Sequence, residues 1–189
     1  GYVYGVVHKK ILTGVDDNGS SVDGEVNVNF GQGWDLDDEV SVSLFDLKAT
    51  IIHEMLHTMG FLSGIFDDGS DLWGSPIGSS GIWEVFDDFL TDKNGVQLIN
   101  DTTFVLNTSS WSSLSIGGAS PSGGLFFNGP KAMAANGGQP VGLYTPTSWE
   151  EGSSGSHLDD ENSALAGALM LAATSTGRYR RSVSDVERG

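Results

Sequence analysis

The chain has 189 residues, with 25 acidic side chains against nine lysines and arginines, and its formal net charge at pH 7 is -16. Such an acidic surface repels phosphate backbones and anionic lipids, which argues against binding to nucleic acids or membrane surfaces. The sequence has no cysteine, and this excludes disulfides, thiolate metal ligands and a cysteine nucleophile. It has no apolar run of about 18 residues, so we expect no transmembrane segment.

The N-terminal part is predicted to form two strands joined by a turn. Residues 2–12 are rich in β-branched and aromatic side chains, which favour extended structure. Residues 25–30 alternate polar and apolar side chains, which predicts a strand with one buried face. We expect this second strand to form a sheet edge with which an extended peptide can pair. His8 lies in the first predicted strand and is expected to have no function there.

Residues 43–60 are predicted to form the one long helix. Apolar side chains recur there at the i, i+3, i+4, i+7 spacing of an amphipathic helix. Ser43 and Asp46 have the spacing of a capping box at its start, and Gly60 lies where a left-handed residue would end it. Because the segment is apolar on most sides, we expect the helix to be buried.

The C-terminal part is rich in glycine, serine and aspartate, which predicts ordered loops between short elements. Residues 84–106 are predicted to form a short helix and a hairpin that turns at Asn94-Gly95. Further expected features are a loop at 107–124, a short helix at 131–136 and the start of another helix at 182–187. We therefore expect an α+β fold with a small mixed sheet, in which an N-terminal lobe (residues 1–62) and a loop-rich C-terminal lobe (residues 63–189) share one site.

The segment His53-Glu54-Met55-Leu56-His57 lies inside the predicted helix. Residues four apart lie on one helix face, so both imidazoles can point at one metal ion. Glu54 is rotated by about 100° from His53, and from there it can reach a water on the metal without being a ligand. The alternative, two surface histidines on an ordinary helix, fits poorly because the flanking side chains are apolar and buried imidazoles need partners.

Two imidazoles do not complete a catalytic zinc site, which usually has three protein ligands and one open position. In the pattern HExxHxxGxxH the third ligand follows the glycine by three residues, and here that position is Ser63, a poor zinc ligand. Glu84 is a second candidate, in an acidic segment downstream of the helix, and His157 is a third. The spacing alone leaves this choice open.

The residues around the two helical histidines resemble the metzincin clan of zinc peptidases. The motif HEMLHTMGF at 53–61 carries this resemblance. The segment FFNGPKAMAANGGQPVGLYTPTSWEEGSSGSHLDD at 126–160, with NSALAGALM after it, is similar to a group of bacterial secreted peptidases of this clan. A third histidine from a distant segment resembles the leishmanolysin-like members. The resemblance extends over about residues 25–189.

The resemblance implies a metzincin-like fold, in which a methionine-containing turn, the Met-turn, lies beneath the metal. It implies that His53, His57 and His157 bind zinc and that Glu54 is the general base. Met170 is implied as the residue of the Met-turn, although a methionine there is also typical of core filling. Metzincin N-terminal lobes usually hold more strands, so the resemblance also implies a truncated lobe with further sequence upstream.

The activity that the resemblance implies is that of a zinc-dependent endopeptidase acting on peptides or proteins. We expect a secreted, extracellular protein of bacterial origin, mature or excised from a longer chain, and monomeric. Two alternatives are a catalytically inactive metzincin-like domain and a calcium-dependent extracellular binding or adhesion module. The second alternative rests on two oxygen-rich loops that resemble calcium ligand sets without matching an EF-hand. Their residues are Asp16, Asp17, Asn18 and Asp23 in one loop and Asp67, Asp68, Ser70 and Asp71 in the other.

Overall fold

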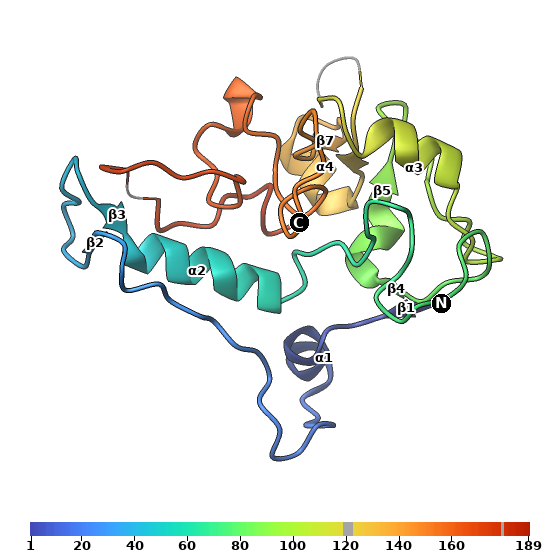
Figure 1. The fold of residues 1–189 in the computed structure, drawn as a ribbon, viewed down its shortest axis with the longest axis horizontal. Helices are drawn as coiled ribbons and strands as arrows, with labels where there is room; N and C mark the ends of the chain where they lie inside the picture. Colours follow the sequence, from blue (N-terminus) through green and yellow to red (C-terminus); the bar gives the residue numbers. More distant parts are fainter. Residues whose placement is uncertain (119–122, 179) are drawn as a thin grey trace.

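The computed structural model describes residues 1–118, 123–178 and 180–189, and it combines short strands and helices with long ordered loops (Figure 1). The fold is mixed α and β, as the sequence predicts. The described strands form three small sheets, in place of the one mixed sheet that we expected. Two are parallel pairs, of β1 (Tyr2–Val3) with β4 (Trp83–Glu84) and of β2 (Trp34–Asp35) with β3 (Phe45–Asp46). The third is antiparallel, in the order β5 (Leu90–Thr91), β6 (Phe126–Phe127) and β7 (Val141–Gly142).

The helices are short. They are α1 (Val6–Thr13), α2 (Leu47–Thr58), α3 (Thr108–Leu114) and α4 (Pro130–Ala135), with the 3-10 helices η1 (Val85–Phe89) and η2 (Ser163–Leu165). In Figure 1, α2 lies beneath the C-terminal part of the chain, and α1 lies near the C-terminal end of α2. None of the helices described here has the length and apolar character that a membrane crossing requires.

Both predicted N-terminal strands are wrong. Of residues 2–12 only β1 is extended, and α1 follows it up to a left-handed Gly14 at φ 69°. Residues 25–30 form no strand and are mostly exposed to solvent. A strand is stabilised by its cross-strand partners, and no described segment pairs with residues 25–30. The alternating pattern of residues 25–30 was therefore not sufficient to form a strand.

Helix α2 carries the predicted motif but begins at Leu47 instead of residue 43. The Asp46 carboxylate caps it and accepts a hydrogen bond from the Ala49 N–H at 3.1 Å. Ser43 plays no part in the cap, because β3 keeps the backbone extended up to Asp46 by pairing with β2. No residue of α2 is fully buried, so the expected burial is also wrong. The helix is half-buried along most of its length.

The C-terminal end of α2 matches the prediction. Gly60 has a φ of 110°, a backbone conformation that L side chains rarely adopt. The Gly60 N–H donates to the His57 carbonyl at 3.0 Å, and the Phe61 N–H donates to the Leu56 carbonyl at 3.1 Å. These two bonds form a Schellman motif, which satisfies the last carbonyls of the helix and turns the chain towards the C-terminal region.

The C-terminal region contains the predicted hairpin and the predicted helix at α4. Thr91 pairs with Gln97 across the turn, and Gly95 has a φ of 80°. Part of the predicted loop 107–124 is instead α3, which the Asn107 side chain caps by accepting a hydrogen bond from Ser110 N–H at 3.1 Å. Residues 119–122 of that predicted loop lie outside the described residues. Residues 182–187 form no helix, and the chain makes a turn at 185–188.

The hydrophobic core lies entirely in the C-terminal region. Within the described residues, every buried apolar side chain lies between Ile65 and Leu171. The largest fully buried side chains include Trp111, Leu90 and Leu143. Burying one such side chain contributes roughly 1.5–3 kcal/mol. This core is the platform against which α2 packs.

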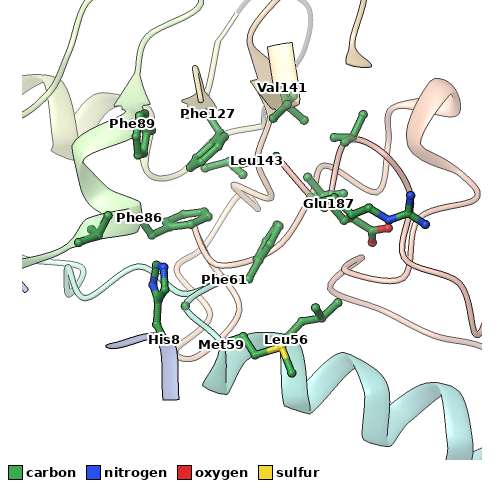
Figure 2. Close-up of a pocket in the computed structure, with 17 residues that line it drawn as sticks. His8, Leu56, Met59, Phe61, Phe86, Phe89, Phe127, Val141, Leu143 and Glu187 are labelled. Atoms are coloured by element: carbon green, nitrogen blue, oxygen red, sulfur yellow. The ribbon is translucent and has the colours of Figure 1, made fainter. Parts of the chain in front are cut away.

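A cavity of about 250 Å³ lies between the end of α2 and the antiparallel sheet (Figure 2). Its walls are mainly apolar, with Phe61, Phe86 and Phe127 among them. His8 also lines it, from α1 and not from the predicted strand, and packs edge-on against Tyr4 at 4.9 Å. Burial lowers the pKa of His8. Leu56 of the 53–57 segment lines this cavity, but His53, Glu54, His57 and His157 do not, so we treat it as separate from the candidate site.

Candidate metal centre

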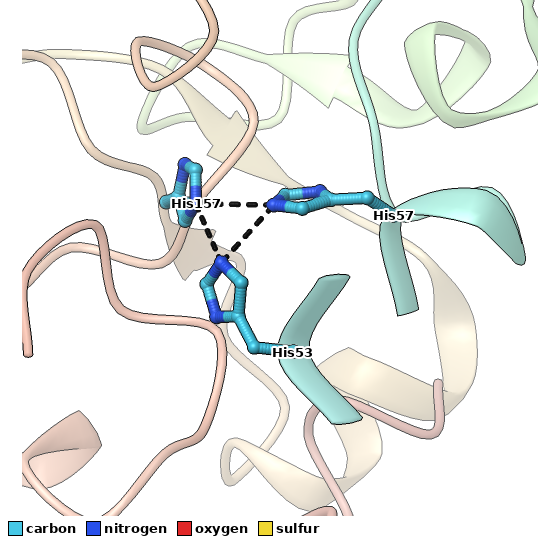
Figure 3. Close-up of side chains that lie close together, drawn as sticks. All are labelled: His53, His57 and His157. Carbon is cyan, nitrogen blue, oxygen red and sulfur yellow. Dashed lines mark hydrogen bonds between the residues drawn. The ribbon is translucent and has the colours of Figure 1, made fainter. Parts of the chain in front are cut away.

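Three histidine side chains meet above α2 (Figure 3). His53 and His57 project from one face of α2, and His157 comes from the loop between β7 and η2. The Nε2 atom of His53 lies 3.0 Å from that of His157, and the Nε2 atom of His57 lies 3.1 Å from each of the other two. The structure therefore selects His157 as the partner of the two helical histidines.

The opposite ring nitrogen of each histidine contacts a backbone carbonyl. The Nδ1 atom of His53 lies 2.9 Å from the Leu169 oxygen, and that of His57 lies 2.6 Å from the Phe61 oxygen. The Nδ1 atom of His157 lies 3.0 Å from the Ser153 oxygen. A carbonyl only accepts hydrogen bonds, so each Nδ1 carries the proton of the neutral ring. Such partners fix the tautomer and the ring orientation of metal-binding histidines.

These tautomers leave a lone pair on every Nε2 atom. Three unprotonated nitrogens cannot donate hydrogen bonds to one another, so the contacts drawn dashed in Figure 3 are the arrangement expected of side chains that can converge on one cation. Tetrahedral zinc with bonds of about 2.0–2.1 Å would hold its nitrogens about 3.3 Å apart. The observed separations of 3.0–3.1 Å are close to that value. The three histidines thus fit a metal ion.

The protonation state of the rings suits ligation. Burial lowers the pKa of His157 to about 4, with the Ser153 carbonyl opposing and the neighbouring His57 and His53 adding to the decrease. Burial also lowers the pKa of His57, against the opposing effect of the Phe61 carbonyl. Both rings are therefore neutral at pH 7, and a metal ion need not displace a proton from either.

Backbone hydrogen bonds fix the loop that carries His157. The His157 carbonyl accepts a hydrogen bond from Tyr144 N–H at 2.8 Å, and Leu158 N–H donates to the Met170 carbonyl at 2.8 Å. Ser63, which has the position of the third ligand in HExxHxxGxxH, contributes to the same loop. Its N–H donates to the hydroxyl of Ser156 at 3.2 Å. Ser63 thus supports the loop next to His157 and is not itself a ligand.

Met170 is fully buried and lies beside the segment that contacts His53. The buried Glu187 carboxylate holds this segment: one oxygen accepts hydrogen bonds from Leu169 N–H at 2.5 Å and Met170 N–H at 2.6 Å. The other oxygen accepts from Ser184 N–H at 2.7 Å. The sequence analysis did not identify Glu187 as a site residue. No local pattern indicates this role, because the contact joins segments 17 and 18 residues apart.

Glu54 is half-buried and follows His53 directly in α2. Together with His53 it lines a second, smaller cavity. Within the described residues, the Glu54 carboxylate has no hydrogen-bond or ion-pair partner that would occupy it. An unoccupied carboxylate next to a ligand is available to accept a proton from water.

Glu84 lies away from the histidines. It lies in β4, where its N–H donates to the Asp87 carboxylate at 3.0 Å and its side chain packs against Gly64. Burial raises the pKa of Glu84. In the described parts of the chain, the one group of three or more histidine or acidic side chains close enough to hold a metal is His53, His57 and His157.

The two acidic loops use their carboxylates within the protein. Asp16 and Asp23 contact the Lys10 ammonium at 2.7 and 2.5 Å, and Asp17 contacts Lys9. In the other loop, the buried Asp71 accepts hydrogen bonds from three backbone N–H groups, at 2.7–3.0 Å. These contacts give acidic side chains of both loops partners within the protein.

Comparisons with protein families, with curated proteins and with solved structures find no significant match to this chain. Three imidazoles bound to carbonyls, with an available carboxylate beside them, can hold a metal ion and accept a proton from water.

Proposed function

We propose that the chain is a zinc-dependent endopeptidase whose metal ligands are His53, His57 and His157. The observation that supports the proposal most strongly is the convergence of three Nε2 lone pairs at 3.0–3.1 Å, with Glu54 beside them. Imidazole ligands suit zinc, and three protein ligands leave the fourth position open for water or substrate. Met170, buried beside Leu169, is proposed as the residue of the Met-turn.

In the proposed mechanism, the metal ion and the protein side chains have separate roles. When bound, zinc supplies Lewis-acid chemistry: it lowers the pKa of a water to about 7 and polarises the scissile carbonyl. The Glu54 carboxylate takes one proton from the attacking water and passes it to the nitrogen of the leaving amine. The Leu169, Phe61 and Ser153 carbonyls keep the three rings oriented through their Nδ1 atoms.

The central test is Glu54→Gln in the zinc-loaded full chain. The amide keeps the size of the side chain but cannot accept the proton, so kcat/KM on casein or on a peptide library should fall by several orders of magnitude. Zinc content should remain one per chain, because Glu54 is not a ligand. Glu84→Gln is the matched control and should keep both activity and zinc. Near-parental turnover in Glu54→Gln would contradict the proposed base.

A second candidate is a metal-binding domain of this kind without catalytic activity. One observation favours it: residues 25–30, expected to receive an extended substrate as a sheet edge, form no strand and pair with no described segment. Stoichiometric zinc without chelator-sensitive cleavage of casein would support this reading. Cleavage that is lost with a chelator and restored with zinc would support the peptidase.

A further inference from the structure

A cavity of about 150 Å³ lies directly beside Glu54 and His53. Helix α2 forms one wall, and residues between Ala168 and Arg178, together with Arg180, form the other. About 10–15 Å³ of such volume is enough for one water molecule, so the space can take a side chain. That side chain would lie next to the proposed catalytic glutamate.

Two arginines line this cavity, Arg178 and Arg180. The Arg180 guanidinium donates one hydrogen bond to the Ala168 carbonyl at 2.9 Å. A guanidinium has five N–H donors, so most of its donors remain available. Arg178 is exposed to solvent. Burial lowers the pKa of Arg180, the charge of the nearby Arg178 lowers it further, and the charge of Glu187 opposes this decrease. Two like charges are thus held together at one cavity.

Most other cations of the described residues are paired. Five of the seven other lysines and arginines form ion pairs with aspartates, namely Lys9, Lys10, Lys48, Arg181 and Arg188, whereas the exposed Lys131 forms none within the described residues. Neither Arg178 nor Arg180 has a carboxylate within ion-pair distance in the described residues, although the chain has 25 acidic residues. Glu54 lines the same cavity but forms no ion pair with them. The guanidinium groups of both arginines are therefore available to bind an anion from outside the chain.

We propose that this cavity binds an aspartate or glutamate side chain of the substrate, next to the scissile bond, through Arg178 and Arg180. The inference rests on the proposed peptidase function. Arginine forks bind carboxylates with two parallel hydrogen bonds, which gives both strength and orientation. The neighbouring Leu169 and Leu171 contact the methylene part of such a side chain from the cavity wall.

The test uses peptides that differ only in one residue next to the cleaved bond, on one side of it or on the other. The varied residue is Asp, Glu, Asn, Gln, Leu or Lys. With the zinc-loaded full chain, kcat/KM for Asp or Glu should exceed that for Asn or Gln by about 10- to 100-fold. Arg178→Gln and Arg180→Gln should each remove most of this preference. Lys131→Gln, which removes one positive charge from exposed residues of α4, should leave it unchanged.

A binding measurement separates this inference from the proposed function. Titration calorimetry of the same peptides with the zinc-loaded Glu54→Gln chain should show the same preference in Kd, lost in Arg178→Gln. Binding with that preference but without cleavage by the parental chain would support the inference and contradict the peptidase. Cleavage with equal kcat/KM for acidic and amide peptides would support the peptidase and contradict the inference. Acidic peptides that fail to bind at millimolar concentration would also overturn the inference.

Discussion

Residues 1–62 and residues 63–189 differ in how they bury apolar side chains. The C-terminal region contains every buried apolar side chain of the described parts. The N-terminal region leaves large apolar side chains in solvent, with Phe30 80% exposed and Leu36 62% exposed, and its buried residues are Asp35 and Asp46. A region without a core of its own gains its stability from the neighbour on which it docks.

The contacts that dock α2 are partly apolar and partly polar. Leu56 and Phe61 pack against the core. The Arg181 guanidinium donates to the Asp46 carboxylate at 2.7 Å, and the same carboxylate caps the helix. Two histidines of the candidate metal centre thus come from the region without a core and the third from the region that has it. The geometry of the site depends on how the two regions meet.

The largest effect is expected in the core. Leu90→Ala, at a fully buried leucine, should lower the free energy of unfolding by about 3–5 kcal/mol, because it removes apolar contacts and leaves a cavity. Leu36→Ala is the matched change in the N-terminal region and should alter the free energy of unfolding by about 0.5 kcal/mol or less. Urea unfolding of both variants checks the difference. Equal losses of unfolding free energy in the two variants would show that the N-terminal region shares the hydrophobic core, and would contradict the difference between the two regions.

The sequence predicted the parts of the site that depend on local geometry. His53, Glu54 and His57 follow from one helical turn, and Gly60 ends that helix as expected. The third ligand was left open by spacing, because it depends on how a loop 100 residues away folds back. The resemblance implied His157, and the structure brings that residue to the helix.

The remaining contacts around the site follow no sequence pattern. Glu187, Leu169 and Ser153 act through hydrogen bonds from loop segments, which have neither helical nor strand periodicity. The predicted strands failed for a related reason: residues 2–12 and 25–30 have strand-like composition, but pairing depends on partners that composition does not specify. Tertiary contacts decided both outcomes.

The second prediction concerns metal removal. Zinc that binds only the folded chain should stabilise it by about 2.7 kcal/mol at a free concentration one hundred times its Kd. Because the ion would join the two regions, a chelator should speed amide exchange in α2 more than in β5–β7. Exchange that rises equally in both would contradict the role of the ion as a link between them.

Two histidine variants serve as controls for metal removal. His157→Ala removes one proposed ligand, so it should abolish the zinc-dependent rise in Tm and lose most of the bound zinc at equal protein concentration. His8→Ala removes a half-buried imidazole outside the cluster and should keep both. Unchanged zinc content in His157→Ala would show that another group completes the site.

The smallest effect is a pH dependence at the junction of the two regions. Asp87 is fully buried and accepts a hydrogen bond from the Gly64 N–H, just after α2, at 3.1 Å. Burial raises the pKa of the Asp87 carboxyl to about 7, although hydrogen bonds from Ser63, Gly64 and Glu84 oppose this. Between about pH 4 and pH 7, the Asp87 carboxyl is therefore protonated in the folded chain. In the unfolded chain, where its pKa is the ordinary value near 4, it has lost that proton.

The sign of the effect follows from this proton. The stabilisation is fully present below about pH 4 and is lost as the pH rises through about 7, with a loss of about 2 kcal/mol between pH 5.5 and pH 8. Urea unfolding of the metal-free chain at these two values measures it. Repulsion among the other carboxylates acts in the same direction, and the lowered pKa values of His8, His57 and His157 act in the opposite one, so the test is a difference between variants. Asp87→Asn should remove the loss of about 2 kcal/mol from the parental pH profile, whereas Asp101→Asn, which removes an exposed carboxylate, should keep that profile. If both variants retain the parental slope, Asp87 is not the group that couples the loop after α2 to protonation.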